Sequence, residues 1–208
     1  MANLGGALKK SGRLDQVEIL YRECLQKRRA TLGDVHPDTL RSMNDVADLL
    51  EDQGQLEGSE ALRRECAESR RTVLGETHPD TLATMNGLAG LLLKKGSTSE
   101  AEGLRRQCVE TCRAKLGESH PHTLASVHFL AVLLQKNGAL DEAELLLRGC
   151  LHKRRAELGE AHSHTQATVE ALAEVLQDNG KGEEAVSLLR EFIQQLEDTG
   201  GEEVEGVG

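Results

Sequence analysis

Apolar and polar residues follow one another along the chain with the spacing of amphipathic helices. In the segment 33–74, the apolar residues of the first half occur at i, i+3, i+6, i+7 and i+10, on one helical face: Leu40, Met43, Val46, Ala47 and Leu50. Gly54 is expected to end this helix. A second helix is predicted from about residue 56 to residue 72, with Leu62 and Cys66 one turn apart. The segment therefore predicts two antiparallel helices joined by a short turn, and no strand.

The same pattern returns every 42 residues. The phrase Leu-Gly-x-x-His-Pro-x-Thr-Leu begins at Leu32, Leu74 and Leu116, and a weaker form begins at Leu158. A fixed period of this length is typical of a stacked array in which each unit is one supersecondary element. We predict an array over residues 1–196 that consists of a partial repeat and four further repeats: 1–32, 33–74, 75–116, 117–158 and 159–196.

The two ends of the chain differ from the array. Ala2–Lys10 is expected to be a shortened first helix with Leu14–Ala30 as its partner, as in a chain that begins within a repeat of a longer array. Because no repeat precedes it, this helix leaves apolar surface uncovered, which predicts weak self-association through the N-terminal end. The segment 197–208 is rich in Gly, carries five carboxylates and no base, and is predicted to be an acidic disordered tail.

The amino-acid composition limits the classes of core, partner and compartment that fit this chain. Only 1% of the residues are aromatic, so the core is expected to be aliphatic. The net charge is −10, and the part that remains outside the tail is still negative, which disfavours a nucleic-acid partner. No apolar run is long enough to span a membrane, and no signal peptide is recognisable. The odd number of cysteines, five, argues against a disulfide framework and favours a reducing, cytoplasmic compartment.

Cysteine and histidine recur once per repeat, which raises the question of metal binding. Stacked helices lie ~10 Å apart, too far for the ligands of one zinc ion, so we expect four cysteines to act as small core residues: Cys24, Cys66, Cys108 and Cys150. Cys112 is predicted to be a partly exposed thiol. Four histidines precede a helix start and are expected to cap it: His36, His78, His120 and His162. The local pairs His120–His122 and His162–His164 leave a weak surface metal site as the alternative.

Arginine also recurs in each second helix. One row of arginines follows a glutamate by four residues in most repeats, which favours ion pairs within a helix over contact with a partner: Arg22, Arg64, Arg106, Arg148 and Arg190. A second row lies in the last turn, where the helix dipole favours a cation: Arg29, Arg71, Arg113 and Arg155. No phosphate loop and no supported nucleophile is recognisable, so the sequence predicts no catalytic site, no cofactor and no metal.

Three motifs resemble those of tetratricopeptide repeats: the Asn-x-Val/Leu-Ala of Asn44–Ala47 and Asn86–Ala89, the helix-ending Gly, and Asp141-Glu142-Ala143-Glu144. The 42-residue spacing with Leu-Gly-x-x-His-Pro is similar to the kinesin light chain type of this repeat. The resemblance covers residues 1–196. The chain departs from the family where Cys replaces the usual Ala in the second helix, and where a frequent aromatic survives only as Tyr21.

The resemblance implies an all-α, right-handed α-solenoid of antiparallel helix pairs. It also implies a non-enzymatic scaffold or adaptor that binds a peptide or protein segment in the concave groove lined by the first helices. The implied groove residues are Arg41, Asn44, Asp48, Asp52, Asn86, Lys94, His128, Lys136, Glu170 and Glu174. Asn44 and Asn86 resemble the asparagines that bind a peptide backbone in this family. The alternative is a sensor or regulatory module of a larger enzyme or ATPase.

Overall fold

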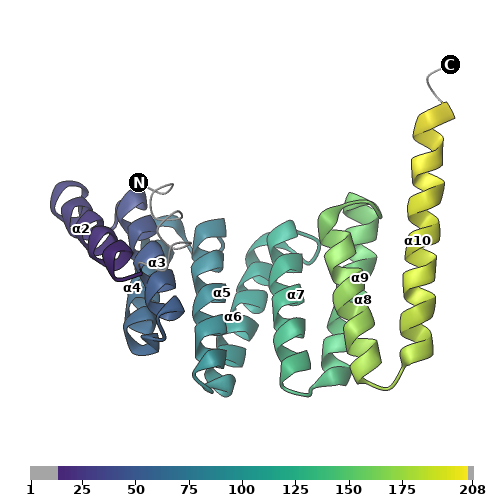
Figure 1. The fold of residues 1–208 in the computed structure, drawn as a ribbon. Coiled ribbons are helices and arrows are strands. Elements are labelled where there is room, and N and C mark those ends of the chain that lie inside the picture. Colours follow the sequence, from purple (N-terminus) through teal and green to yellow (C-terminus); the bar gives the residue numbers. More distant parts are fainter. Residues whose placement is uncertain (1–13, 206–208) are drawn as a thin grey trace. The chain divides into compact units, whose positions relative to one another are not determined.

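The computed structural model describes residues 14–205, with side chains for residues 17–198, and the regular structure in this range is entirely helical. The helices are α2 Leu14–Leu32, α3 Pro37–Asp52, α4 Leu56–Leu74, α5 Pro79–Lys94, α6 Thr98–Leu116, α7 Pro121–Lys136, α8 Leu140–Leu158, α9 Ser163–Asp178 and α10 Gly182–Glu205 (Figure 1). The predicted all-α fold of helix pairs is confirmed. The shortened first helix expected at Ala2–Lys10 lies outside the described residues.

The chain divides into two compact units, Met1–Cys108 and Val109–Gly208, and α6 begins in one and ends in the other. In the first unit α3 packs against both α2 and α4, and α4 packs against α5. In the second unit α8 lies between α7 and α9, and α10 packs against α9. Neighbouring helices in each unit run in opposite directions, as their short connections require (Figure 1).

The repeat is regular at the level of single turns. The four described first helices, α3, α5, α7 and α9, have 16 residues each, and α4, α6 and α8 have 19 each. Gly54, which follows α3, has φ +77°, and Gly75, which follows α4, has φ +92°. A Cβ at either position would meet no neighbouring atom, so backbone conformation, rather than crowding, favours glycine there. The predicted helix ends are confirmed.

Each unit has an aliphatic core, as the composition predicts. In the first unit the core includes Leu40, Met43, Leu50 and Cys66. In the second unit the corresponding layer is formed by the buried residues Leu134, Leu147, Cys150, Val169 and Leu172. The recurrent cysteines therefore pack as small apolar residues, and all five cysteines are free thiols.

The prediction for Cys112 is wrong. Its side chain is fully buried, with Sγ 3.7 Å from Oγ of Ser126, and burial raises the pKa of the thiol. In the neighbouring repeats this position holds Arg70 and Arg154, which are themselves buried. Helical spacing alone could not show this, because an arginine in that register suggested a surface position.

The C-terminal segment also differs from expectation. The backbone of α10 is helical to Glu205, well into the segment 197–208 for which the sequence predicts disorder. Disorder was predicted there from the high Gly content and the net negative charge. Glu and Gln are good helix formers, and continuing an existing helix needs no new nucleation.

Among the described residues, no helix combines the length and the hydropathy needed to cross a bilayer.

Candidate functional site

The recurrent histidines cap the first helices. Nδ1 of His36 lies 3.1 Å from the backbone N of Asp38 and accepts its hydrogen bond, and His78 does the same for Asp80 at 3.2 Å. His120 and His162 cap α7 and α9 in the same way. The lone pair of a neutral imidazole thus takes one of the free N–H groups at each helix start. The predicted capping role is confirmed.

This geometry also bears on the metal alternative. In the pairs His120–His122 and His162–His164 the ring centroids lie 5.2 Å and 5.1 Å apart, but the first histidine of each pair uses Nδ1 for the cap. Across the part of the chain with described side chains, no three His, Cys, Asp or Glu residues gather where they could hold a metal ion.

At three junctions an arginine links one helix pair to the next, and at the fourth Cys112 takes its position. Nη1 of Arg70 in α4 donates to the carbonyl oxygen of Asp80 at 2.8 Å and to Oγ1 of Thr84 at 2.6 Å, both in the first turns of α5. Arg154 makes the same two bonds to His164 and Thr168, and Arg28 to Asp38 and Ser42. Sequence reasoning missed these links. Their signal is an arginine followed 14 residues later by Ser or Thr.

The exposed arginine row joins second helices together. Arg64 contacts Glu60, four residues earlier, at 2.9 Å, and also Glu100 of α6 at 2.5 Å. Arg148 contacts Glu144 at 3.0 Å and Glu184 of α10 at 2.8 Å. The predicted pairs at i−4 are confirmed, and the contacts 36 residues ahead were not foreseen. Because the guanidinium groups of Arg64 and Arg148 are each shared by two carboxylates of the same chain, these two residues have a structural role.

Glu144 is the most strongly perturbed carboxyl group described. It is 8% exposed. Its carboxylate accepts hydrogen bonds from Lys181 at 2.8 Å, from Asn179 at 3.0 Å and from Arg148 at 3.0 Å. The hydrogen bond from Lys181, together with those from Asn179 and Arg148, outweighs burial and lowers the pKa of Glu144 to about 2. Glu60 with Lys95 repeats this arrangement in the first unit. These groups hold the turn within one helix pair against the second helix of the preceding pair.

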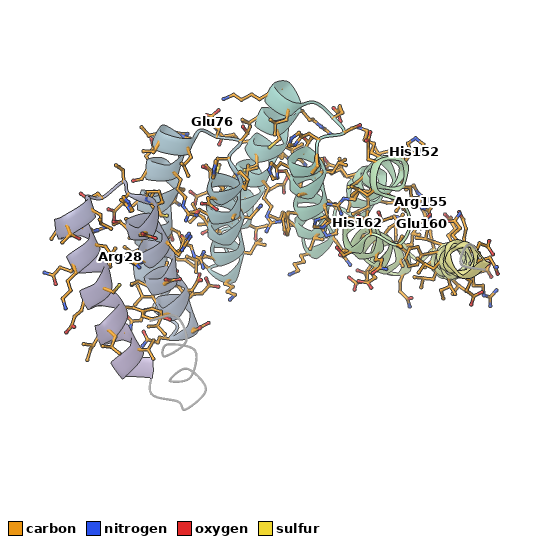
Figure 2. The ribbon with its side chains drawn as sticks, turned by 90° about the horizontal axis from the view of Figure 1, so that it is seen from above. Arg28, Glu76, His152, Arg155, Glu160 and His162 are labelled. Carbon is orange, nitrogen blue, oxygen red and sulfur yellow. The ribbon has the colours of Figure 1, made fainter. Side chains whose placement is uncertain are left out.

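Glu160 shows the opposite behaviour. It lies in the connection between α8 and α9, beside Arg155, with Nε and Oε1 2.6 Å apart (Figure 2). Burial raises its pKa, and Arg155 offsets this only in part. One oxygen, Oε2, is buried without a hydrogen-bond partner. Arg113 and Glu118 form the equivalent pair at 3.2 Å, so the second arginine row also has a structural role.

In the first unit, several of the expected groove residues are engaged within the repeat stack. Arg63 is buried and donates to Asp48 at 2.7 Å and to Glu51 at 2.8 Å. Lys94 reaches the other oxygen of Glu51 at 2.5 Å. The amide of Asn44 donates to Oγ1 of Thr84 at 3.3 Å, which ties α3 to α5.

The other expected groove residues differ in their exposure. Asn86 is half-buried on α5, and its side chain makes no hydrogen bond within the part of the chain described here. Arg41 and Asp52 are exposed on α3. In the second unit Lys136 is exposed on α7, and His128 is half-buried with its ring 5.9 Å from that of Phe129.

Glu170 and Glu174 line a cleft that sequence reasoning did not find. The cleft has a volume of about 520 Å³ and lies between α9 and α10, with one residue from α7. Its lining residues are Gln135, Glu170, Ala173, Glu174, Gln177, Asp178, Ala185, Val186 and Leu189. One wall is therefore acidic and the other aliphatic.

The repeat pattern matches models of the tetratricopeptide repeat over residues 1–58, 44–114 and 123–164. No curated protein matches the sequence. Among solved structures, the chain is similar to a Podosopora anserina protein of the kinesin light chain type with nearly identical TPR-like repeats, at 29% identity and a TM-score of 0.75. That alignment covers 95% of this chain and 93% of the other.

Two more distant structures share the fold alone. BtubC (BKLC) from P. vanneervenii is 20% identical, with a TM-score of 0.74 over 95% of this chain and 79% of that one. A Rap protein complexed with Competence and Sporulation Factor is 15% identical, with a TM-score of 0.65 over 92% of this chain and 51% of that one.

Proposed function

The chain belongs to the tetratricopeptide repeat family, and on that premise we propose that it is a non-enzymatic scaffold for a peptide or protein segment. Folds of this family generally serve as protein–protein interaction modules. The proposed contact surface consists of the outward faces of the first helices, α3 and α5 in the first unit and α7 and α9 in the second. The free thiols fit a reducing compartment, so cytoplasmic proteins are the proposed source of ligands.

The observation that carries this proposal is a contrast between the two kinds of helix. On the second helices, Arg64 and Arg148 are each shared between two carboxylates of the same chain. On the first helices, Asn86, Lys136 and Glu174 keep polar groups without a side-chain partner among the described residues. Such groups can bind a ligand without first breaking an internal contact.

Asn86 is the residue most suited to an extended ligand. An amide side chain offers both a donor and an acceptor, so it can pair with a peptide backbone whatever the ligand sequence. Asn44 is less available, because its amide already donates to Thr84. The Rap protein of this fold is complexed with a factor, which supports the idea that the architecture can hold a ligand.

The test is peptide selection against the purified chain, followed by binding measurements. Peptides selected from a random display library would be synthesised, labelled and titrated by fluorescence anisotropy. We expect Asn86→Ala to weaken binding by about three- to tenfold, the effect of one or two hydrogen bonds. Gln26→Ala, at an exposed position on α2, serves as the matched control and should leave the Kd unchanged. Equal affinity for the Asn86→Ala and wild-type chains would place recognition outside the first-helix faces.

A further inference from the structure

Helix α10 ends the second unit with a row of exposed aliphatic residues. Val186, Leu189 and Ile193 occur at i, i+3 and i+7, and are 47%, 37% and 55% exposed. In α8 the equivalent positions of the last two are Leu147 and Leu151, which are 0% and 4% exposed. The difference arises because α9 follows α8 and packs on it, whereas no helix follows α10 among the described residues.

In α4 and α8 the equivalent face contacts the helix that follows. In α8, Arg154 of this face bonds to the first turns of α9. In α4, Arg63 lies so close to α5 that a Cβ on Gly87 would collide with its guanidinium, and Arg70 bonds to Thr84. This face of a second helix can therefore pack against a further helix that runs antiparallel to it.

The chemistry of this face changes in α10. The four positions that are Glu60, Arg63, Ala67 and Arg70 in α4 become Val186, Leu189, Ile193 and Leu196. A helix seated here would be held by apolar contact rather than by buried arginine hydrogen bonds.

The opposite wall of the cleft is acidic. Glu170 and Glu174 are exposed on α9 and have no side-chain partner in residues 17–198, and Asp178 accepts a hydrogen bond from Gln135 at 2.7 Å. No Lys or Arg is among the lining residues. Arg190, the only base of α10, occupies the position of Arg64 and Arg148, which reach the next second helix instead.

We propose that the cleft between α9 and α10 binds an amphipathic helix of a partner protein. The partner helix presents aliphatic residues one turn apart to Val186, Leu189 and Ile193, and Lys or Arg on its flank to Glu170 and Glu174. Charge complementarity selects the basic helix, and apolar burial supplies the affinity. This site goes beyond the proposed function, because its ligand is helical and its aliphatic wall belongs to α10, a second helix.

The chain itself supplies a probe and a matched control. A synthetic peptide of residues 121–136 has the sequence of α7, a first helix with one lysine and no carboxylate. A peptide of residues 37–52 has the sequence of α3, with the same length and repeat position, but five carboxylates and one arginine. In fluorescence anisotropy, we expect the 121–136 peptide to bind saturably and the 37–52 peptide to bind at least about tenfold more weakly.

Variants locate the site. The double substitution Leu189→Ser with Ile193→Ser should weaken binding of the 121–136 peptide by about tenfold or more. Leu145→Ser is the control, because Leu145 is 72% exposed in the same unit and does not line the cleft. Glu170→Gln with Glu174→Gln changes only exposed residues, keeps the fold, and should weaken binding by about threefold, less so at high salt. Asn86→Ala should have no effect, which separates this proposal from the first-helix proposal.

Three results would overturn the proposal: no saturable binding of the 121–136 peptide, equal binding of both peptides, or full binding by the glutamine double variant and the serine double variant. Sedimentation equilibrium tests whether a second copy of this chain occupies the face of α10 instead. A wild-type mass that rises with concentration, and returns to that of a monomer in the serine double variant, would assign the face to a second copy of this chain instead of a partner protein.

Discussion

At the scale of single residues, two glutamates of the second unit show how position decides the effect of a charge. Glu144 and Glu160 both contact an arginine and both are largely withdrawn from solvent. Glu144 has three donors, whereas one oxygen of Glu160 has none. The pKa of Glu144 is therefore lowered to about 2, and the pKa of Glu160 is raised.

We predict that Glu144→Gln lowers the free energy of unfolding at pH 7 by about 2 kcal/mol, because charged hydrogen bonds are lost. The folded pKa of Glu144 lies below its ordinary value of 4.5, so its contribution is complete above pH 4.5 and is lost as the pH falls towards about 2. Wild type and variant should therefore converge in urea unfolding as the pH is lowered through this window. Equal stabilities at pH 7 would contradict the prediction.

Glu160→Gln is the matched control, because it makes the same substitution at another glutamate that contacts an arginine. The folded pKa of Glu160 is raised, so its ionisation costs stability as the pH rises above the ordinary value of 4.5, and the cost is complete above the folded pKa. Neutralising it should change the free energy of unfolding at pH 7 by less than about 0.5 kcal/mol, or increase it.

At the scale of the helix, the repeated Leu-Gly-x-x-His-Pro motif marks the start of a first helix. His78 supplies the capping acceptor, Pro79 occupies the first helical turn, and Asp80 places a negative charge at the positive end of the dipole. The same arrangement precedes α3, and α7 keeps its His and Pro. A capping histidine thus precedes every described first helix.

We predict that His78→Ala lowers the free energy of unfolding by about 1 kcal/mol, whereas His78→Asn retains most of the stability because the amide oxygen can accept the same bond. Thermal unfolding followed by circular dichroism would measure both variants. If alanine and asparagine were equally destabilising, the hydrogen bond from Asp80 N could not be the reason for histidine at this position.

At the scale of the whole molecule, periodicity predicted more than chemistry did. The 42-residue period predicted the antiparallel helix pairs and the boundaries at Gly54 and His36, because these two residues act through local backbone geometry. It did not reveal that Arg70 and Cys112 share a buried position, since burial there depends on the next helix pair. The cleft at α9 and α10 was missed for a similar reason, because the exposure of Val186 and Leu189 depends on which helices pack on α10.

Because the links between helix pairs are made by particular side chains, damage to one link should stay local. In a repeat array each element contacts only its neighbours, so stability is a sum of local terms. Arg154 is 3% exposed, and its bonds to His164 and Thr168 join α8 to α9. Arg148 joins α8 to α10 at a more exposed position.

We predict that Arg154→Ala costs about 2–3 kcal/mol, because the carbonyl of His164 and the hydroxyl of Thr168 each lose a charged donor and a buried side chain is removed. Arg148→Ala, the exposed control, should cost less than about 1 kcal/mol. Hydrogen exchange followed by mass spectrometry should show faster exchange in α8 and α9 of the Arg154→Ala chain and unchanged exchange in α3 and α4. Faster exchange spread evenly over both units would mean that the array unfolds as one cooperative body. In that case the recurrent arginine would stabilise the whole chain rather than a single junction.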